Sequence, residues 1–340
     1  MRPSKKEKQM KKLQTNDRAI GAGQPFEPTT PIGIYQETRI PMNRHTRRII
    51  LSMAAVVLAG LAMAAPRPAT AQYAFTISDV PGATSTDLVG FTGNTMVGDF
   101  NDTEGNTHGW LFSATSGKFQ QYDVPGAWFT GLSAINHRGQ FGGVYRDDPQ
   151  LPARRRGFVV MNGVLTTIDY PGSTRTTIVH MNDRGQAVGI GRIPSDGPTT
   201  PHGFIWQDGV INDVSFPGAF GTGLDGINEQ GDVCGFTTDE AGGLTHAMMR
   251  VNGVFSHIEP PGAIDSLALS INDRGQVAGW YDDAKGNTHG FLYYGGVFTT
   301  VDPPGSLGSE VTTTDNNGLI AGDYVGMDGA SHGFIGTPKH

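Results

Sequence analysis

The most regularly placed residues that could do chemistry in this chain are histidines. A His-Gly-aromatic triplet begins at His108, His202, His289 and His332, and His246 begins a looser copy. Neutral imidazole is a common metal ligand, but all ligands of one ion must lie within about 2 Å of it. The triplets recur once per repeat of the chain, so the fold is expected to hold these histidines apart. We interpret them as structural hydrogen-bonding groups and predict no metal, cofactor or catalytic residue.

A basic run, Arg154, Arg155 and Arg156, lies close to Asp147 and Asp148. One interpretation is a solvated group of salt bridges, which would add little stability. The other is recognition of a carboxylate, sulfate or phosphate, because guanidinium groups bind such anions through paired hydrogen bonds. The sequence leaves both interpretations open.

Four further residues differ from their counterparts in the other repeats. Trp128 and Phe129 could stack on a sugar ring, or they could pack within the fold. His180 and Asp225 could bind metal or move protons, but they differ by one position in strand phase. They should therefore point to opposite faces of a strand and form no joint site. The candidate ligand-binding residues are Trp128, Phe129, Arg154, Arg155, Arg156, Arg175 and His180.

Known catalytic and calcium-binding motifs give no positive signal. Two acidic hairpins, residues 99–105 and 282–286, loosely suggest calcium loops, but they lack the full ladder of ligands and are typical of turns. The sequence contains no Ser nucleophile elbow, phosphate loop, dinucleotide fingerprint or zinc-protease motif. An enzyme is therefore the weaker functional class.

An internal repeat must position all of these residues. Pro-Gly recurs at Pro81, Pro125, Pro171, Pro217, Pro261 and Pro304, with spacings of 43 to 46 residues. An Asn-x-x-Gly element follows at Asn136, Asn182, Asn228 and Asn272, and Asp315 takes the same place. Self-similarity at this period is typical of repeat architectures, in which each repeat is one supersecondary unit.

Each repeat contains four short segments rich in Val, Ile, Thr and aromatic residues, as strands are. The pairs Asn162-Gly163, Asp208-Gly209 and Asn252-Gly253 separate a fourth segment from the next first one, and they suit type I′ hairpin turns. This pattern predicts an all-β fold, a six-bladed β-propeller of four-stranded antiparallel blades. A β-solenoid is the alternative, but its coils are usually much shorter.

The order of strand types predicts how the ring closes. The repeating chain starts with a first-type strand at 75–80 and ends with a fourth-type strand at 332–335. These two types form the tight hairpin elsewhere, so the N-terminal strand is expected to pair with the C-terminal one. That pairing would latch the ring and protect its sheet edges.

Loop lengths point to one face of the predicted propeller. The interval from the third-strand Gly to the His position varies from 10 to 13 residues, whereas the other intervals are nearly constant. The variable hairpins and the Pro-Gly crossovers should project together, on what we call the crossover face. Variable loops on a rigid scaffold usually carry binding. We therefore expect a binding or surface-interaction module; the alternatives are a secreted carbohydrate-active hydrolase or lyase with its site at the channel mouth, and a purely structural envelope component.

The start of the chain resembles an export signal. From Met42, a basic stretch with three arginines at 44–48 precedes an uncharged apolar run at 49–65, and a small-x-small pattern follows at 69–71. A membrane anchor is the alternative, since the apolar run is at the lower limit for a span. The domain prediction is an upstream extension at 1–41, disordered if present, a signal peptide at 42–71 and the propeller at 72–340. Cleavage near Ala71-Gln72 would leave a secreted or periplasmic protein.

Charge and cysteine content limit the partners of the mature chain. Residues 72–340 hold 13 Lys and Arg against 28 Asp and Glu, a net charge of −15. Such a charge argues against nucleic acid and anionic membranes as partners. The expected partner is a small molecule, a glycan or a cell-surface partner, and the protein is expected to be a monomer. The single cysteine, Cys234, excludes an intrachain disulfide and is expected in the core.

The repeat resembles that of bacterial extracellular proteins with the HAF-type repeat. That family is named for a His-Ala-aromatic triplet beside Pro-Gly and Asn-x-x-Gly elements. Here the triplet is mostly His-Gly-Phe or His-Gly-Trp, and His246-Ala247-Met248 is nearest in its centre. The resemblance covers about residues 73–340 and implies an exported repeat protein, without implying an activity.

Overall fold

The computed structural model describes residues 73–77, 80, 82–148, 150–151, 154–193, 200–240 and 243–338. Within these ranges the chain is all-β and contains no helix, so none that could cross a membrane. The expected extension at 1–41 and signal peptide at 42–71 lie outside the described residues.

Antiparallel pairing divides the described strands into sets of four. The first set is β2 (Ser85–Thr92), β3 (Thr95–Asn101), β4 (Thr107–Ser113) and β5 (Lys118–Tyr122). The second is β6 (Phe129–Ile135), β7 (Phe141–Arg146), β8 (Arg156–Met161) and β9 (Val164–Ile168). The third is β10 (Arg175–Met181), β11 (Ala187–Arg192), β12 (His202–Gln207) and β13 (Val210–Val214).

The remaining sets repeat this order. The fourth is β14 (Gly221–Ile227), β15 (Val233–Thr238), β16 (Thr245–Val251) and β17 (Val254–His257). The fifth is β18 (Asp265–Ile271), β19 (Val277–Asp282), β20 (Thr288–Tyr294) and β21 (Val297–Val301). The sixth is β22 (Gly308–Thr314), β23 (Ile320–Val325) and β24 (Ser331–Pro338), completed by β1 (Tyr73–Ile77).

The two ends of the described chain meet in the sixth set. β1 pairs antiparallel with β24, with Tyr73 opposite Pro338 and Ile77 opposite Phe334. The predicted pairing of the N-terminal and C-terminal strands is thus present, with the N-terminal strand at 73–77 instead of 75–80.

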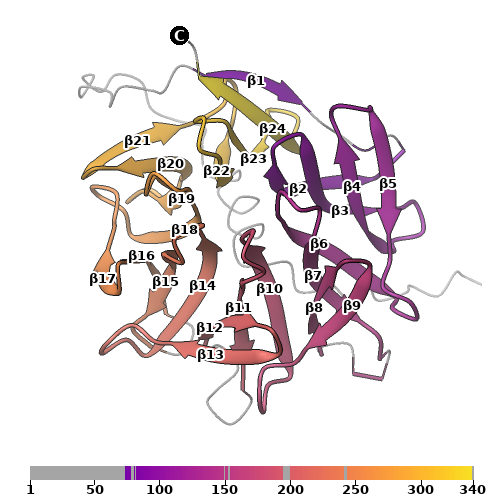
Figure 1. The fold of residues 1–340 in the computed structure, drawn as a ribbon. Helices are drawn as coiled ribbons and strands as arrows, with labels where there is room; N and C mark the ends of the chain where they lie inside the picture. Colours follow the sequence, from indigo (N-terminus) through magenta and orange to yellow (C-terminus); the bar gives the residue numbers. More distant parts are fainter. Residues whose placement is uncertain are drawn as a thin grey trace, which may run out of the picture. The chain divides into compact units, whose positions relative to one another are not determined.

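The first strand of each set is the inner strand, and successive inner strands contact one another (Figure 1). Each inner strand carries a bulge at the same place, for example between Ala268 and Ser270 of β18. Opposite that bulge, a Cβ on Gly279 would lie 2.0 Å from the backbone oxygen of Leu267. Gly is therefore required by close backbone approach in the second strand of the set, which is the third strand of the repeat in the sequence.

The tight turns have the expected backbone. Asn162 and Gly163 have φ angles of 52° and 77°, and Asn252 and Gly253 have 51° and 79°. Positive φ at both central positions is what a type I′ hairpin requires. These turns join the third strand of a set to its outer strand, as the sequence predicts for the fourth strand of one repeat and the first strand of the next.

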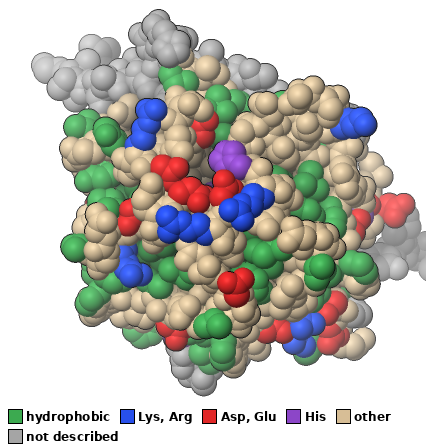
Figure 2. Space-filling model, in the orientation of Figure 1, with side chains coloured by type: hydrophobic (Ala, Val, Ile, Leu, Met, Phe, Trp, Pro, Cys, Tyr) green, Lys and Arg blue, Asp and Glu red, His purple; other side chains and the backbone are tan. Residues whose placement is uncertain are grey.

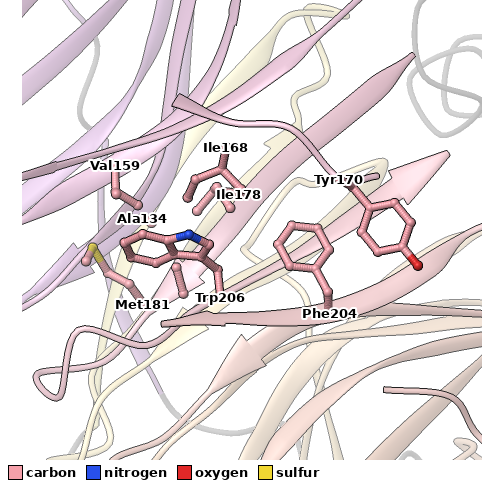
Figure 3. Close-up of a cluster of buried hydrophobic side chains, with 9 residues drawn as sticks. Ala134, Val159, Ile168, Tyr170, Ile178, Met181, Phe204 and Trp206 are labelled. Carbon is pink, nitrogen blue, oxygen red and sulfur yellow. The ribbon is translucent and has the colours of Figure 1, made fainter. Parts of the chain in front are cut away.

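The hydrophobic core lies between neighbouring sets. One cluster joins Ala134 of β6 and Val159 of β8 to Ile178 of β10 and Phe204 of β12 (Figure 3). Cys234 is fully buried in the equivalent cluster of the fourth and fifth sets, as expected. Because adjacent sets share their apolar side chains, no set is expected to be stable without its neighbours.

Candidate functional site

A cavity of about 190 Å³ opens on the crossover face between the first and second sets. Its lining combines polar groups of the β3–β4 hairpin and β4 with aromatic residues that follow the Pro-Gly crossover. The lining residues are Asn106, Thr107, His108, Asp123, Ala127, Trp128 and Phe129. Two of the predicted ligand-binding residues, Trp128 and Phe129, therefore lie together at one cavity.

The aromatic wall of this cavity is supported by a buried arginine. The guanidinium carbon of Arg146 lies 4.6 Å from the ring centre of Phe129 and 5.3 Å from that of Trp128. Trp128 remains 39% exposed, so one part of its ring is available to a ligand. The cation beneath the rings holds them in place and strengthens the wall.

The polar groups of the cavity are oriented by a hydrogen-bonded clamp. The His108 Nδ1 lies 3.1 Å from Asp123 Oδ1, and its Nε2 lies 3.3 Å from Asp102 Oδ2. Burial lowers the pKa of His108, but the hydrogen bonds to both acids outweigh it, so the net shift is upward. Asp123 thus offers a fixed acceptor at the cavity, whereas both ring nitrogens of His108 are already engaged by the two acids.

The same clamp recurs in other sets. His246 lies between Glu259 and Asp239, and His289 lies 2.9 Å from Asp302. These contacts agree with the structural role expected of the repeated histidines. They join the third-to-fourth hairpin to the segment before the crossover, so each clamp ties two loops of the crossover face together.

The arginines at 154–156 do not all have the same surroundings, and only some of them form the salt-bridge group considered from the sequence. Arg156 takes the place of the clamp histidine and contacts Asp169 at 2.7 Å and Asp147 at 3.1 Å. Arg154 lies 3.9 Å from Asp169. These two arginines form the solvated salt-bridge group. Arg155 is separate, because its backbone bridges to Arg175 at the start of β10.

Four acids that the sequence analysis did not single out gather on the inner strands and their neighbours. They are Asp87 of β2, Asp99 of β3, Glu310 of β22 and Asp323 of β23. Burial and the Asp87 carboxylate raise the pKa of Asp99 to about 8, although Arg155 opposes this. Burial and the nearby Asp282 and Asp87 raise the pKa of Glu310 to about 7. We call these residues the inner acidic group.

The inner acidic group makes folding depend on pH in an unusual direction. Raised pKa values mean that the folded state holds protons which the unfolded state releases, so stability falls as pH rises from about 4 to about 8. We expect the melting temperature of the full chain to be several degrees lower at pH 8 than at pH 5, and Asp99→Asn to reduce that difference. Thermal unfolding followed by circular dichroism measures both; a melting temperature that rises over this range would contradict the expectation.

A second cavity, of about 220 Å³, lies at the opposite end of the inner strands. The Asn-x-x-Gly turns surround it, with Asp183, Glu229 and Asp273 at its edge. Figure 2 shows acidic, basic and histidine side chains gathered near the centre of one face of the molecule. His180 also lines the cavity, whereas Asp225 is not in its lining and interacts electrostatically with Arg192. His180 and Asp225 thus have different surroundings, as the strand phase implies.

The Asn-x-x-Gly turns are held together by what we call the amide belt. Each Asn side chain donates to the backbone oxygen of the corresponding residue in the next turn. The pairs are Asn136 to Asn182, Asn182 to Asn228, Asn228 to Asn272 and Asn272 to Asp315. The acids of this face are used in the same way, since Asp183 Oδ1 accepts from the backbone of His137 and Glu229 Oε1 from that of Asp183. These hydrogen bonds connect neighbouring turns, so we assign them a structural role.

No family model and no curated protein matches the sequence. Among solved structures, the β-propeller domain of the Trilobed protease from Pyrococcus furiosus aligns with a TM-score of 0.50 at 10% identity, covering 76% of this chain and 80% of that one. An acylaminoacyl peptidase from Pyrococcus horikoshii aligns with a TM-score of 0.50 at 11% identity, covering 75% of this chain and 44% of the peptidase. A putative TolB from Agrobacterium tumefaciens gives 0.49 at 11% identity, with 75% and 91% covered. The fold is a β-propeller.

At these identities the likeness extends to the propeller fold alone. Within this propeller, sequence reasoning found Trp128, Phe129 and Arg155 because each breaks the repeat. It did not find Arg146, Arg192 or the inner acidic group. Asp99 and Asp323 do occupy one repeat position, the residue after the third-strand Gly, where the second to fifth repeats have apolar residues. Comparing the residues at this position from repeat to repeat would have identified Asp99 and Asp323 from the sequence alone.

Proposed function

We propose that residues 72–340 form an exported, closed six-bladed β-propeller that acts as a binding module with its ligand on the crossover face. The four-stranded sets support the blade count, and the pairing of β1 with β24 supports the latch. Contact between β2 and β22 and the hydrogen bond from Thr312 Oγ1 to Leu88 O support closure between the sixth and first blades. The resemblance to HAF-type repeat proteins and the signal-like residues 42–71 support export.

The observation that carries the binding proposal is the cavity at Trp128. Small-molecule sites combine an apolar wall with a few fixed polar groups. Here the wall is Trp128 and Phe129, and the fixed groups are Asn106, His108 and Asp123. A sugar ring presents C–H groups to an aromatic face and hydroxyls at its edge, so a monosaccharide unit of a glycan is the ligand this lining suits best.

The repeat supplies a matched control for testing this cavity. Trp128, Phe220, Ile264 and Leu307 all occupy the third position after the repeated Pro and are 39–46% exposed. Only Trp128 lines the cavity between the first two blades. A change at Phe220 therefore removes a comparable exposed apolar side chain from the same face without touching the cavity.

The test is a titration of the full-length protein with a panel of methyl glycosides, followed by tryptophan fluorescence and calorimetry. We expect at least one sugar to bind, Trp128→Ala to weaken its binding about tenfold or more, and Phe220→Ala to leave it unchanged. Equal effects of the two substitutions would contradict the assigned cavity. Absence of binding by every glycoside at millimolar concentration would contradict the sugar assignment.

The convergence of the inner acidic group favours a second candidate, a carbohydrate-active hydrolase or lyase. Carboxyl groups whose pKa values lie near 7 or 8 serve as general acids at neutral pH, and glycosidases use such pairs. Release of reducing ends from a polysaccharide panel, abolished by Asp99→Asn while Trp128→Ala retains turnover, would favour the enzyme over the binding module.

A further inference from the structure

Three arginines lie side by side where the second and third blades meet on the crossover face. Arg175 and Arg192 are directly opposite in the β10–β11 register, and Arg155 bridges to Arg175. The bridge is a backbone contact on both sides, since Arg155 donates to Thr174 O and accepts from Thr176 N. Directly opposed residues of an antiparallel pair point to one face of the sheet. The backbone thus brings three positive charges together.

A fourth arginine, Arg146, reaches the same region from β7, which contacts β10. Its side chain is only 7% exposed, and its Nε has no hydrogen-bond partner among the described residues. Within that same part of the chain, no carboxylate forms an ion pair with Arg146 or Arg155. A buried, unpartnered guanidinium N–H is expensive unless something accepts from it.

Asp99 does little to neutralise Arg155. It acts on this arginine, but burial raises the pKa of Asp99 to about 8. Burial, and after it the neighbouring arginines, lower the pKa of Arg155 to about 10, so this guanidinium lies close to other positive charges. In a mature chain with net charge −15, four arginines that repel one another stand out.

We propose that Arg146, Arg155, Arg175 and Arg192 form a binding site for an oxyanion, the phosphate, sulfate or carboxylate group of a small ligand. Guanidinium groups from three strands and one loop converge there, and each can donate paired hydrogen bonds to such a group. An anion would accept from the unpartnered Nε of Arg146 and remove the repulsion between Arg175 and Arg192. This site adjoins the sugar-binding cavity, because Arg146 also lies against the rings of Trp128 and Phe129, but none of the four arginines lines that cavity.

The experiment measures binding of sodium phosphate, sodium sulfate and sodium acetate to the full-length protein by calorimetry and by thermal shift, against sodium chloride at equal ionic strength. We expect at least one of the three to bind with millimolar or better affinity and to raise the melting temperature where chloride does not. Which of them binds most tightly identifies the kind of oxyanion. Arg155→Gln should weaken binding at least about tenfold, whereas Arg274→Gln, on the opposite face, should not.

A second readout separates a ligand site from a structural ion network. In dilute buffer without phosphate or sulfate, Arg155→Gln should raise the melting temperature, because it removes one of the repelling charges. If Arg155 instead stabilises the fold through Asp99, the substitution lowers the melting temperature in every buffer, and the proposal is wrong. Binding that is equal in wild type and Arg155→Gln, or matched by chloride, also overturns it.

Discussion

Replacing Gly279 by alanine should destabilise the propeller by about 3 kcal/mol or more. A Cβ at this position would lie 2.0 Å from the backbone oxygen of Leu267 and 2.9 Å from the ring of Phe291. The first of these atoms belongs to the inner strand at its bulge, so it moves only if the β18–β19 pairing is displaced. Relief of the clash therefore requires loss of backbone hydrogen bonds in the blade centre.

Gly253→Ala is the matched control for this prediction. Gly253 has a φ of 79° and nothing within 4 Å of the added Cβ, so its substitution adds backbone strain without a clash. That strain costs about 1–2 kcal/mol. Urea unfolding of both variants measures the difference, with soluble yield as the readout if Gly279→Ala does not fold. A Gly279→Ala variant that is no less stable than Gly253→Ala would contradict this prediction, because the inner strand would then accommodate the added Cβ at little cost.

Asn182→Ala should cost about 2–4 kcal/mol of unfolding free energy, the second largest effect we expect from one substitution. The Asn182 side chain is 3% exposed and makes four bonds of 2.9–3.1 Å. Its Oδ1 accepts from the amides of Arg184 and Gln186, and its Nδ2 donates to Asn228 O in the next blade. Alanine would leave both amides and that carbonyl without this partner.

Asn182→Asp separates the two functions of this side chain. In the sixth set of strands Asp315 already holds its turn with a carboxylate, accepting from the amides of Asn317 and Leu319. An Asp at 182 should therefore keep the turn but lose the donor to the next blade, giving a loss smaller than that of alanine. The free energies of unfolding from urea titrations test this order. Equal losses would mean that the link between blades carries the whole effect, and no loss in either variant would contradict the amide belt.

Local signals were sufficient to predict the strands and turns. Asn-Gly pairs such as Asn252-Gly253 favour the positive φ angles of a tight hairpin turn. Segments rich in β-branched residues favour strands. The repeat of these two signals therefore predicts the strand order and the pairing of β1 with β24. The role of the Asn-x-x-Gly element was not predictable in the same way. Its link to the next turn joins residues 43 to 46 positions apart, and only the packing of blades brings them together.

For the candidate binding residues, too, the sequence predicted one part and only the structure showed the other. Comparison among repeats marked Trp128, Phe129 and Arg155 as exceptions, because a residue that departs from its equivalents is visible in the sequence itself. It could not show that Arg146 lies beneath the rings of Trp128 and Phe129, or that Arg175 faces Arg192. Such contacts depend on strand register and on which blades are neighbours, and a one-residue shift would reverse the side that each side chain faces.

By itself the sequence determined an acidic, glycine-rich repeat of β-strands, because periodic spacing and turn chemistry are local properties. It also determined which positions break the repeat. Only the tertiary structure decided which of them converge: Trp128 with His108 at a cavity, four arginines at one blade junction, and acids from β2, β3, β22 and β23 near one another. The physical reason is that charge and cavity shape are summed over neighbouring blades, so they depend on distances in space that spacing along one chain does not contain.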